Sequence, residues 1–201
     1  MRAAVLARRR ALPAPVLADA AARVRESLSA LVRRTPVGRV CAYVPVGAEP
    51  GGDALPAELA SALPGDGSLL LPVLRPDLDL DWAVYAGPGS LVPAGRGLRE
   101  PRGPRLGVDA VRSADLVVVP ALAVDVEGIR LGRGGGSYDR VLARVRPDIP
   151  VVALLHDGEL VPAVPAQPHD RRVSGVIAPT AGFVPLPTRR PLDERDGLTH
   201  H

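Results

Sequence analysis

Four glycines in the second half of the chain carry the strongest chemical signal. Gly132, Gly134, Gly135 and Gly136 directly precede a segment with helical spacing, within the string RLGRGGGSYDR at 130–140. Glycine backbones take left-handed conformations readily, and successive N–H groups in such a turn form an anion-binding concavity. The N-terminus of the following helix adds its dipole. One interpretation is a phosphate-binding loop; the other is a flexible loop with no ligand, and the glycines alone do not decide between them.

Charged side chains flank this loop in a pattern that suits phosphate chemistry. Arg130 and Arg133 carry guanidinium groups, which donate paired hydrogen bonds to phosphate oxygens. Asp139 falls in the first turn of the expected helix, where a carboxylate beside a phosphate is a natural Mg²⁺ ligand, although it would also complement the helix dipole without any metal. The loop has no GK[ST], and Ser137 stands where GxGxxG needs glycine, so neither of these motifs applies.

Helical and strand-like segments alternate along the chain on both sides of the loop. Helices are predicted at 15–34, 53–63, 108–112 and 137–146, and strands at 39–46, 68–74, 80–85, 116–120, 151–156 and 173–178. Strands that are apolar throughout and alternate with helices are typical of a mostly parallel sheet covered on both faces. Ligands bind such sheets beyond the carboxyl ends of the strands, which directs attention to Glu49, the glycine loop and the segment after His156.

The fold class predicted from this alternation is a single α/β domain, a Rossmann-like arrangement of three layers. It is expected to span residues 1–183, with a long surface loop rich in glycine and proline at 87–105. Residues 184–201 are polar and rich in proline, and they are predicted to form a disordered tail.

The composition is that of a globular protein with unusual basic residues. The chain has 201 residues, of which 46% are hydrophobic and 23% charged, enough to bury a core without disulfides. All 25 basic residues are arginine, against 22 acidic ones. The coding bias of a GC-rich genome explains this preference; nucleic-acid binding is the alternative. Aromatic residues, the stacking platforms for single strands, make up only 2%, and the arginines are mixed with acids.

The single cysteine and the apolar runs indicate the cell compartment in which the protein is expected. Cys41 has no partner for an internal disulfide, which favours a reducing compartment, and its place in a predicted strand favours a core residue over a nucleophile. No apolar run is long enough to span a bilayer, and the arginine-rich start lacks the apolar core of a secretory signal. We therefore expect a cytoplasmic protein.

Together with VVVPALAVD at 117–125, the string RLGRGGGSYDR resembles the signature of the 5-formyltetrahydrofolate cyclo-ligase family. The resemblance extends from the arginine-rich N-terminus to about Thr180. It implies an enzyme that uses ATP and Mg²⁺ to close 5-formyltetrahydrofolate to 5,10-methenyltetrahydrofolate, by phosphorylating the formyl oxygen. It also implies a monomer that acts on small molecules, with no nucleic-acid or membrane partner.

The resemblance assigns roles to individual residues. The implied ATP-binding residues are Arg2, Arg9, Arg130, Leu131, Gly132, Arg133, Gly134, Gly135, Gly136, Ser137 and Tyr138. The implied folate-binding residues are Val44, Glu49, Arg133, Gly134, Gly135, Gly136 and Ser137. Asp139 and Asp170 are the implied metal ligands, and Arg130, Arg133 and Tyr138 the implied catalytic residues.

Two positions depart from the family pattern. Ser137 replaces the first aromatic of the family's YYD, and the N-terminal lysine of the family has no counterpart in this sequence. These departures leave open the alternative that the chain is a folate- or nucleotide-binding relative without catalytic activity.

Overall fold

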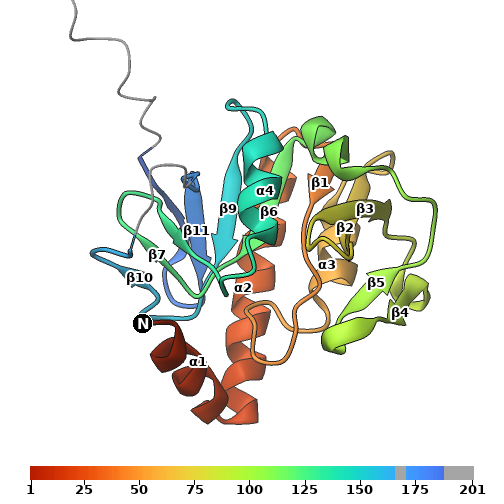
Figure 1. Ribbon diagram of the computed structural model, residues 1–201. Coiled ribbons are helices and arrows are strands. Elements are labelled where there is room, and N and C mark those ends of the chain that lie inside the picture. The colour runs from red at the N-terminus through yellow and green to blue at the C-terminus, as the bar shows by residue number, and fades with distance from the viewer. Residues whose placement is uncertain (166–170, 188–201) are drawn as a thin grey trace, which may run out of the picture.

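A seven-stranded sheet forms the centre of the molecule in the computed structural model, which describes residues 1–165 and 171–187 (Figure 1). Its strands are β1 Arg39–Cys41, β2 Ser68–Leu74, β3 Leu80–Val84, β6 Leu116–Pro120, β9 Val151–Leu154, β11 Gly175–Ala178 and β12 Gly182–Pro185. Their order is β12-β11-β9-β6-β1-β2-β3. The five central strands are parallel, and only the edge strands β3 and β12 run antiparallel to their neighbours. The predicted mostly parallel sheet is confirmed.

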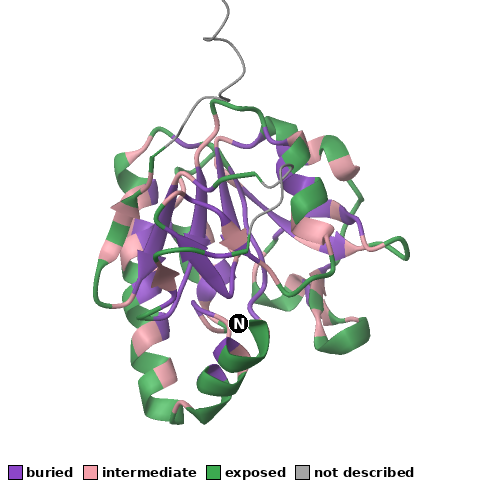
Figure 2. Ribbon diagram, turned by 60° about the vertical axis from the view of Figure 1, so that its left-hand side comes forward, coloured by how far each residue is buried: buried purple, intermediate pink, exposed green. Residues whose placement is uncertain are grey.

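Helices cover both faces of this sheet, as the alternation of segments predicted. Those on the main sheet are α2 Ala14–Arg34, α3 Leu55–Ala62 and α4 Ser137–Arg144, with a 3₁₀ helix, η3, at Val108–Ser113, while α1 Arg2–Ala11 packs through Val5 on a separate small sheet. Successive strand residues point to opposite faces. Val40 and Ala42 therefore pack with α2 and α3, while Cys41 packs with α4 and η3. The strands between the two helix layers are the most buried part of the fold (Figure 2).

Cys41 is fully buried in this core. Burial raises the pKa of its thiol to about 12, so the sulfur stays protonated at neutral pH. The prediction of a core residue in a strand is thus confirmed, since a nucleophilic cysteine would need an accessible thiolate.

Two smaller sheets lie beside the main one. The first has the order β10-β7-β8, from β7 Ala123–Asp125, β8 Arg130–Leu131 and β10 Leu160–Val161. The second is a hairpin of β4 Leu91–Pro93 and β5 Arg99–Pro101, with the 3₁₀ turns η1 Pro88–Ser90 and η2 Gly95–Gly97. The hairpin corrects the prediction of a long surface loop at 87–105, where frequent glycine and proline obscured two short strands. The Leu74 amide donates to Glu100 Oε1 at 2.9 Å and ties the hairpin to β2.

Several boundaries differ from the predictions. The first strand ends at Cys41 instead of residue 46, and Pro45, which has no N–H, falls in the irregular segment that follows. The helix predicted at 53–63 is α3, which spans Leu55–Ala62 and has Ala54 rather than Asp53 as its N-cap. The boundary predicted at residue 183 falls inside β12, because Val184 pairs with Val176. Residues 188–201, the rest of the predicted tail, lie outside the described residues.

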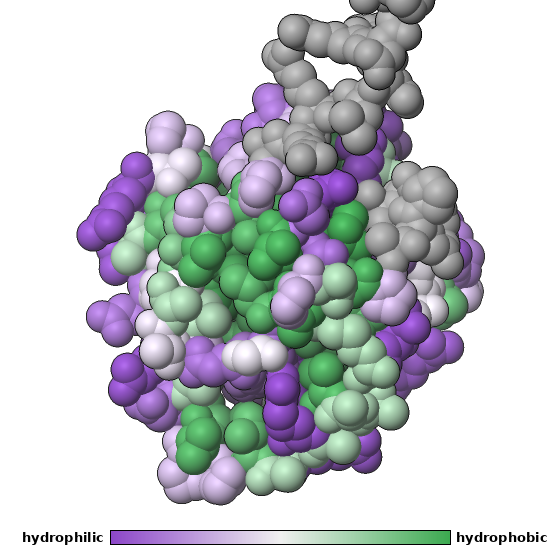
Figure 3. All heavy atoms as spheres, turned by 90° about the vertical axis from the view of Figure 1, so that its left-hand side faces the viewer, coloured by the Kyte–Doolittle hydropathy of each residue, from purple (hydrophilic) through white to green (hydrophobic). Residues whose placement is uncertain are grey.

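Hydrophobic residues also reach the surface. The side on which β7, β10 and β11 lie in Figure 1 shows a central group of hydrophobic residues bordered by hydrophilic ones (Figure 3). Apolar atoms normally contribute more than half of a folded protein's surface, so this distribution is ordinary. Among the described residues, no helix combines the length and apolar character that a membrane crossing requires.

Candidate active site

A cleft of about 410 Å³ opens beyond the carboxyl ends of the central strands. The segments that follow β1, β2 and β6 contribute to its walls, as do the glycine loop and the start of α4. Glu49 and the loop at 132–136 therefore meet at the position that the topology predicted. His156 is not in the wall, but its Nε2 lies 2.9 Å from the Ala48 carbonyl oxygen, directly behind the segment that carries Glu49.

The glycine loop has the backbone that its sequence predicts. Gly134 has φ +98° and Gly136 has φ +72°, which favour glycine over any other residue. Gly136 is also the N-cap of α4, with no side-chain hydrogen bond to cap the helix. The first-turn N–H groups thus remain available to an anion. From α1, Arg2 Nε donates to the Gly132 carbonyl at 2.9 Å and fixes the start of the loop.

Arg130 is a buried cation of the site, with only 5% of its side chain exposed. It donates to Asp139 Oδ1 at 2.6 Å and to the Pro120 carbonyl at 3.2 Å, and its guanidinium carbon lies 5.8 Å from the centre of the Tyr138 ring. Its Nε is buried with no hydrogen-bond partner among the described residues. Leaving a charged donor unpaired is costly, so this corner of the cleft fits an anionic oxygen.

Glu49 and Arg133 form an ion pair between the first loop and the glycine loop. Arg133 Nη2 lies 3.0 Å from Glu49 Oε1, and the Val46 amide donates to Glu49 Oε2 at 2.9 Å. Burial raises the pKa of Glu49, while the Val46 N–H and Arg133 oppose the shift. Burial likewise raises the pKa of Tyr138, so its hydroxyl stays protonated and can donate a hydrogen bond.

The raised pKa of Glu49 predicts that the stability of Glu49→Gln, measured relative to the wild type, increases as pH rises. The folded wild type holds its proton at a pH where the unfolded chain has released it, so its unfolding free energy falls as pH rises through that window. Glutamine cannot titrate and retains an acceptor for Val46. We expect the wild type to lose stability relative to Glu49→Gln between about pH 4 and the raised pKa of Glu49, a window set by its ordinary value near 4.3. Denaturant titrations across this range measure it; a relative gain by the wild type contradicts it.

Arg9 lies in the cleft wall and is held there by other groups of the fold. It is 3% exposed, and it donates to both carboxylate oxygens of Glu159, at 2.8 and 2.7 Å, and to the Ala121 carbonyl at 2.6 Å. These contacts favour an anchor for α1 over an ATP ligand. Glu159 is 1% exposed, and nothing in the sequence singled it out except an acid at the edge of a buried segment.

The remaining predicted residues divide into three groups. Val44, Ser137, Tyr138 and Asp139 join the glycines in the cleft wall. Leu131 does not, because its side chain packs in the core of the small sheet. Asp170 lies outside the described residues. Sequence reasoning missed the part of the wall contributed by the turn between β2 and β3 and by the hairpin, namely Leu74, Leu78, Leu80, Arg96, Leu98, Arg99 and Glu100.

The residues present fit a magnesium ion only in combination with a phosphate. The described part of the chain holds no cluster of three or more acidic, histidine or cysteine side chains that would bind a metal alone. Magnesium is commonly held by one or two carboxylates together with substrate phosphates, and Asp139, half exposed beside the loop, supplies one.

These features define a three-layer α/β protein whose cleft joins an anion-binding loop to a buried carboxylate. Residues 1–179 match the 5-formyltetrahydrofolate cyclo-ligase family, and the chain belongs to this family. It is 44% identical to a 5-formyltetrahydrofolate cyclo-ligase of Mycolicibacterium smegmatis over 92% of this chain and 95% of that protein. The resemblance read from the sequence is therefore confirmed, and with it the expectation of an enzyme.

Solved structures agree with this assignment. The 5,10-methenyltetrahydrofolate synthetase of Aquifex aeolicus superposes with a TM-score of 0.71 at 26% identity, over 100% of this chain and 95% of that one. A synthetase of the same name from Mycoplasma pneumoniae gives 0.68 at 17% identity, over 87% and 94% of the two chains, which supports the fold.

Proposed function

We propose that this chain closes 5-formyltetrahydrofolate to 5,10-methenyltetrahydrofolate with consumption of ATP. The observation that carries the proposal is the joining of two binding elements in one cleft, where Arg133 of the glycine loop lies 3.0 Å from Glu49. One element suits a triphosphate and the other suits the N–H groups of a reduced pterin. The arrangement brings a phosphoryl donor and its acceptor together, which is the main requirement of phosphoryl transfer.

The chemical problem is a poor leaving group. The formyl oxygen does not leave readily as hydroxide. We propose that the γ-phosphoryl group of ATP transfers to this oxygen, releasing ADP and forming an iminium phosphate on the folate. The second folate nitrogen then attacks the formyl carbon and loses its proton, and phosphate departs with the former formyl oxygen. No protein nucleophile is needed.

In this proposal the side chains of the cleft neutralise the charge of the phosphates and orient the two substrates. Arg130 and Arg133, with the N–H groups of the loop and of the first turn of α4, would bind the phosphate oxygens as negative charge moves during transfer. Arg133 would exchange its contact with Glu49 for phosphate, which frees the carboxylate to accept N–H groups of the pterin. The protonated Tyr138 hydroxyl would donate to an oxygen of either substrate.

Magnesium, held by Asp139 and by Asp170 as the resemblance implies, would offset the negative charge of the phosphates. We also propose that the enzyme acts as a cytoplasmic monomer on small molecules alone; a buried, reduced Cys41 is consistent with that compartment.

This proposal is tested by measuring turnover with Mg²⁺ present and again after its removal. We expect 5-formyltetrahydrofolate to give a product absorbing in the near ultraviolet only when ATP and Mg²⁺ are both present. Chelation should abolish the signal, and added Mg²⁺ should restore it. With ¹⁸O in the formyl group, the label should appear in inorganic phosphate.

Two other results would overturn it. Binding of folate and ATP without product would identify a relative that lacks catalytic activity. Product formed without transfer of label to phosphate would exclude the phosphorylated intermediate.

A further inference from the structure

Two residues other than glycine have a left-handed backbone in the described part of the chain, and both line the cleft. Leu78 has φ +64° in the turn between β2 and β3, and Arg96 has φ +62° in the turn of the β4–β5 hairpin. This conformation is disfavoured for any L-residue with a side chain. Such strain concentrates at functional sites, where the rest of the fold holds it in place.

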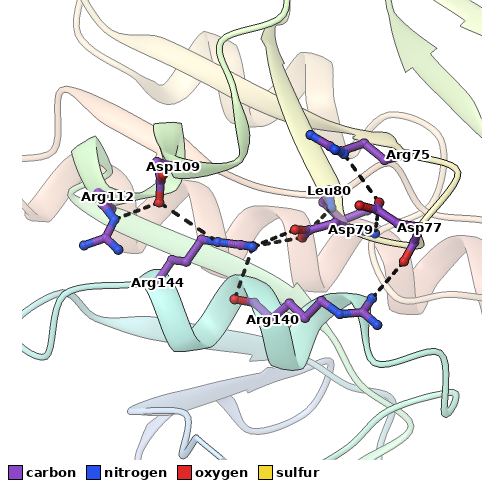
Figure 4. Close-up of polar contacts among 8 residues, drawn as sticks. All are labelled: Arg75, Asp77, Asp79, Leu80, Asp109, Arg112, Arg140 and Arg144. Atoms are coloured by element: carbon purple, nitrogen blue, oxygen red, sulfur yellow. Dashed lines mark hydrogen bonds and ion pairs between the residues drawn. The ribbon is translucent and has the colours of Figure 1, made fainter.

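The turn that carries Leu78 is tightly held by α4 (Figure 4). Arg144 donates to both carboxylate oxygens of Asp79, at 2.8 and 2.6 Å, and Arg140 Nη1 donates to the Asp77 carbonyl at 3.3 Å. Inside the turn, the Asp79 amide donates to Asp77 Oδ1 at 3.1 Å. Arg144 and Asp79 are mostly buried, with 22% and 11% of their side chains exposed, so this paired contact is shielded from solvent.

The helix that holds this turn is also the helix that follows the glycine loop. Its first residue, Ser137, lies in the cleft wall, and its last, Arg144, clamps the turn that carries Leu78. A single rigid element therefore sets the distance between the phosphate-binding loop and the wall formed by the turn.

The chemistry of this wall differs from that of the loop. Leu74, Leu78, Leu80 and Leu98 give it apolar side chains, and the hairpin adds Arg96 and Arg99, both exposed, and Glu100, whose carboxylate accepts the Leu74 amide. Arg96 has no ion pair within residues 1–165 and 171–187. An apolar surface next to an unpaired guanidinium suits a flat ring that is linked to a carboxylate.

We propose that Leu78 and Arg96 form the subsite for the aminobenzoyl-glutamate half of the folate, with Leu78 against the ring and Arg96 at a carboxylate. Arg144 is a positioning residue, which acts through Leu78. This assignment rests on the proposed function, which supplies the substrate.

Glycine substitutions test the subsite without harming the fold. Because glycine adopts positive φ freely, Leu78→Gly and Arg96→Gly should melt no lower than the wild type. Each should raise KM for 5-formyltetrahydrofolate about tenfold, as expected for loss of one specific contact, and leave KM for ATP unchanged. Arg102→Gly, an exposed arginine outside the cleft wall, is the matched control.

A substrate that lacks glutamate distinguishes the two contacts. With the methylamide of 5-formyltetrahydropteroate, which has no carboxylate, the penalty of Arg96→Gly should disappear, while that of Leu78→Gly should persist. Adding Arg144→Gln should raise the folate KM in the wild type but not in Leu78→Gly, where no side chain remains to be positioned.

Each of these results can contradict the proposal. If the wild type turns over and both glycine variants keep its folate KM, the subsite assignment is wrong while the proposed function stands. An Arg96→Gly penalty that persists without glutamate excludes the carboxylate contact. If the wild type itself forms no product, the proposed function fails instead.

Discussion

Asp139→Asn should reduce kcat about 10²–10³-fold, the loss typical when one preorganised electrostatic group is removed from a reaction centre. The amide oxygen of the variant side chain can still accept the hydrogen bond that Arg130 donates to Asp139 at 2.6 Å, and because residue 139 is half exposed, solvent offsets part of the lost charge. The variant loses the negative charge of the Asp139 carboxylate, which would hold Mg²⁺ beside the phosphates. Steady-state turnover at several Mg²⁺ concentrations measures both the loss in rate and any shift in metal requirement.

Asp66→Asn is the control for this change. Asp66 is exposed in the turn before β2 and away from the cleft, so the same loss of charge should leave turnover unchanged. If Asp139→Asn also turns over normally, Asp139 serves only to hold Arg130, and the assignment of the metal site is wrong.

Glu159→Gln should destabilise the protein by about 3–5 kcal/mol, because it leaves the Arg9 guanidinium buried without a counter-charge. Both carboxylate oxygens of Glu159 bind Arg9, and Oε2 also accepts the His156 amide at 2.8 Å. Loss of the pair loosens α1, which also carries Arg2 and its contact with the Gly132 carbonyl. Urea unfolding followed by circular dichroism measures the change.

Two variants make this prediction specific to the buried pair. Asp19→Asn removes one partner of an exposed ion pair with Arg23 and should change stability little. Replacing Arg9 and Glu159 together by methionine should recover most of the lost stability, since apolar residues of similar volume often substitute well for a buried ion pair. A double variant no more stable than Glu159→Gln contradicts the argument.

The sequence predicts those parts of the site whose residues lie within a few positions of one another in the chain. The glycines at 134 and 136 and the neighbouring Arg130, Arg133 and Asp139 indicate their chemistry within a few positions of each other. Apolar runs likewise predicted the sheet, because a parallel strand buried on both faces reads as an uninterrupted apolar segment.

The parts that could not be predicted depend on contacts between distant segments. Arg9 and Glu159 are 150 positions apart, and Arg144 and Asp79 are 65 apart. At the sequence level each looks like an ordinary surface charge. Their burial follows only from the docking of α1 on the small sheet and of α4 on the β2–β3 turn, so no local pattern could have identified them.

A crystal structure with a non-hydrolysable ATP analogue, Mg²⁺ and 5-formyltetrahydrofolate tests the central claim most directly. We expect the phosphates on the N–H groups of residues 132–137, the metal at Asp139, and Arg133 turned from Glu49 to phosphate, with the pterin on the freed carboxylate. A nucleotide bound elsewhere, with the loop empty and Arg133 still paired to Glu49, would contradict the account.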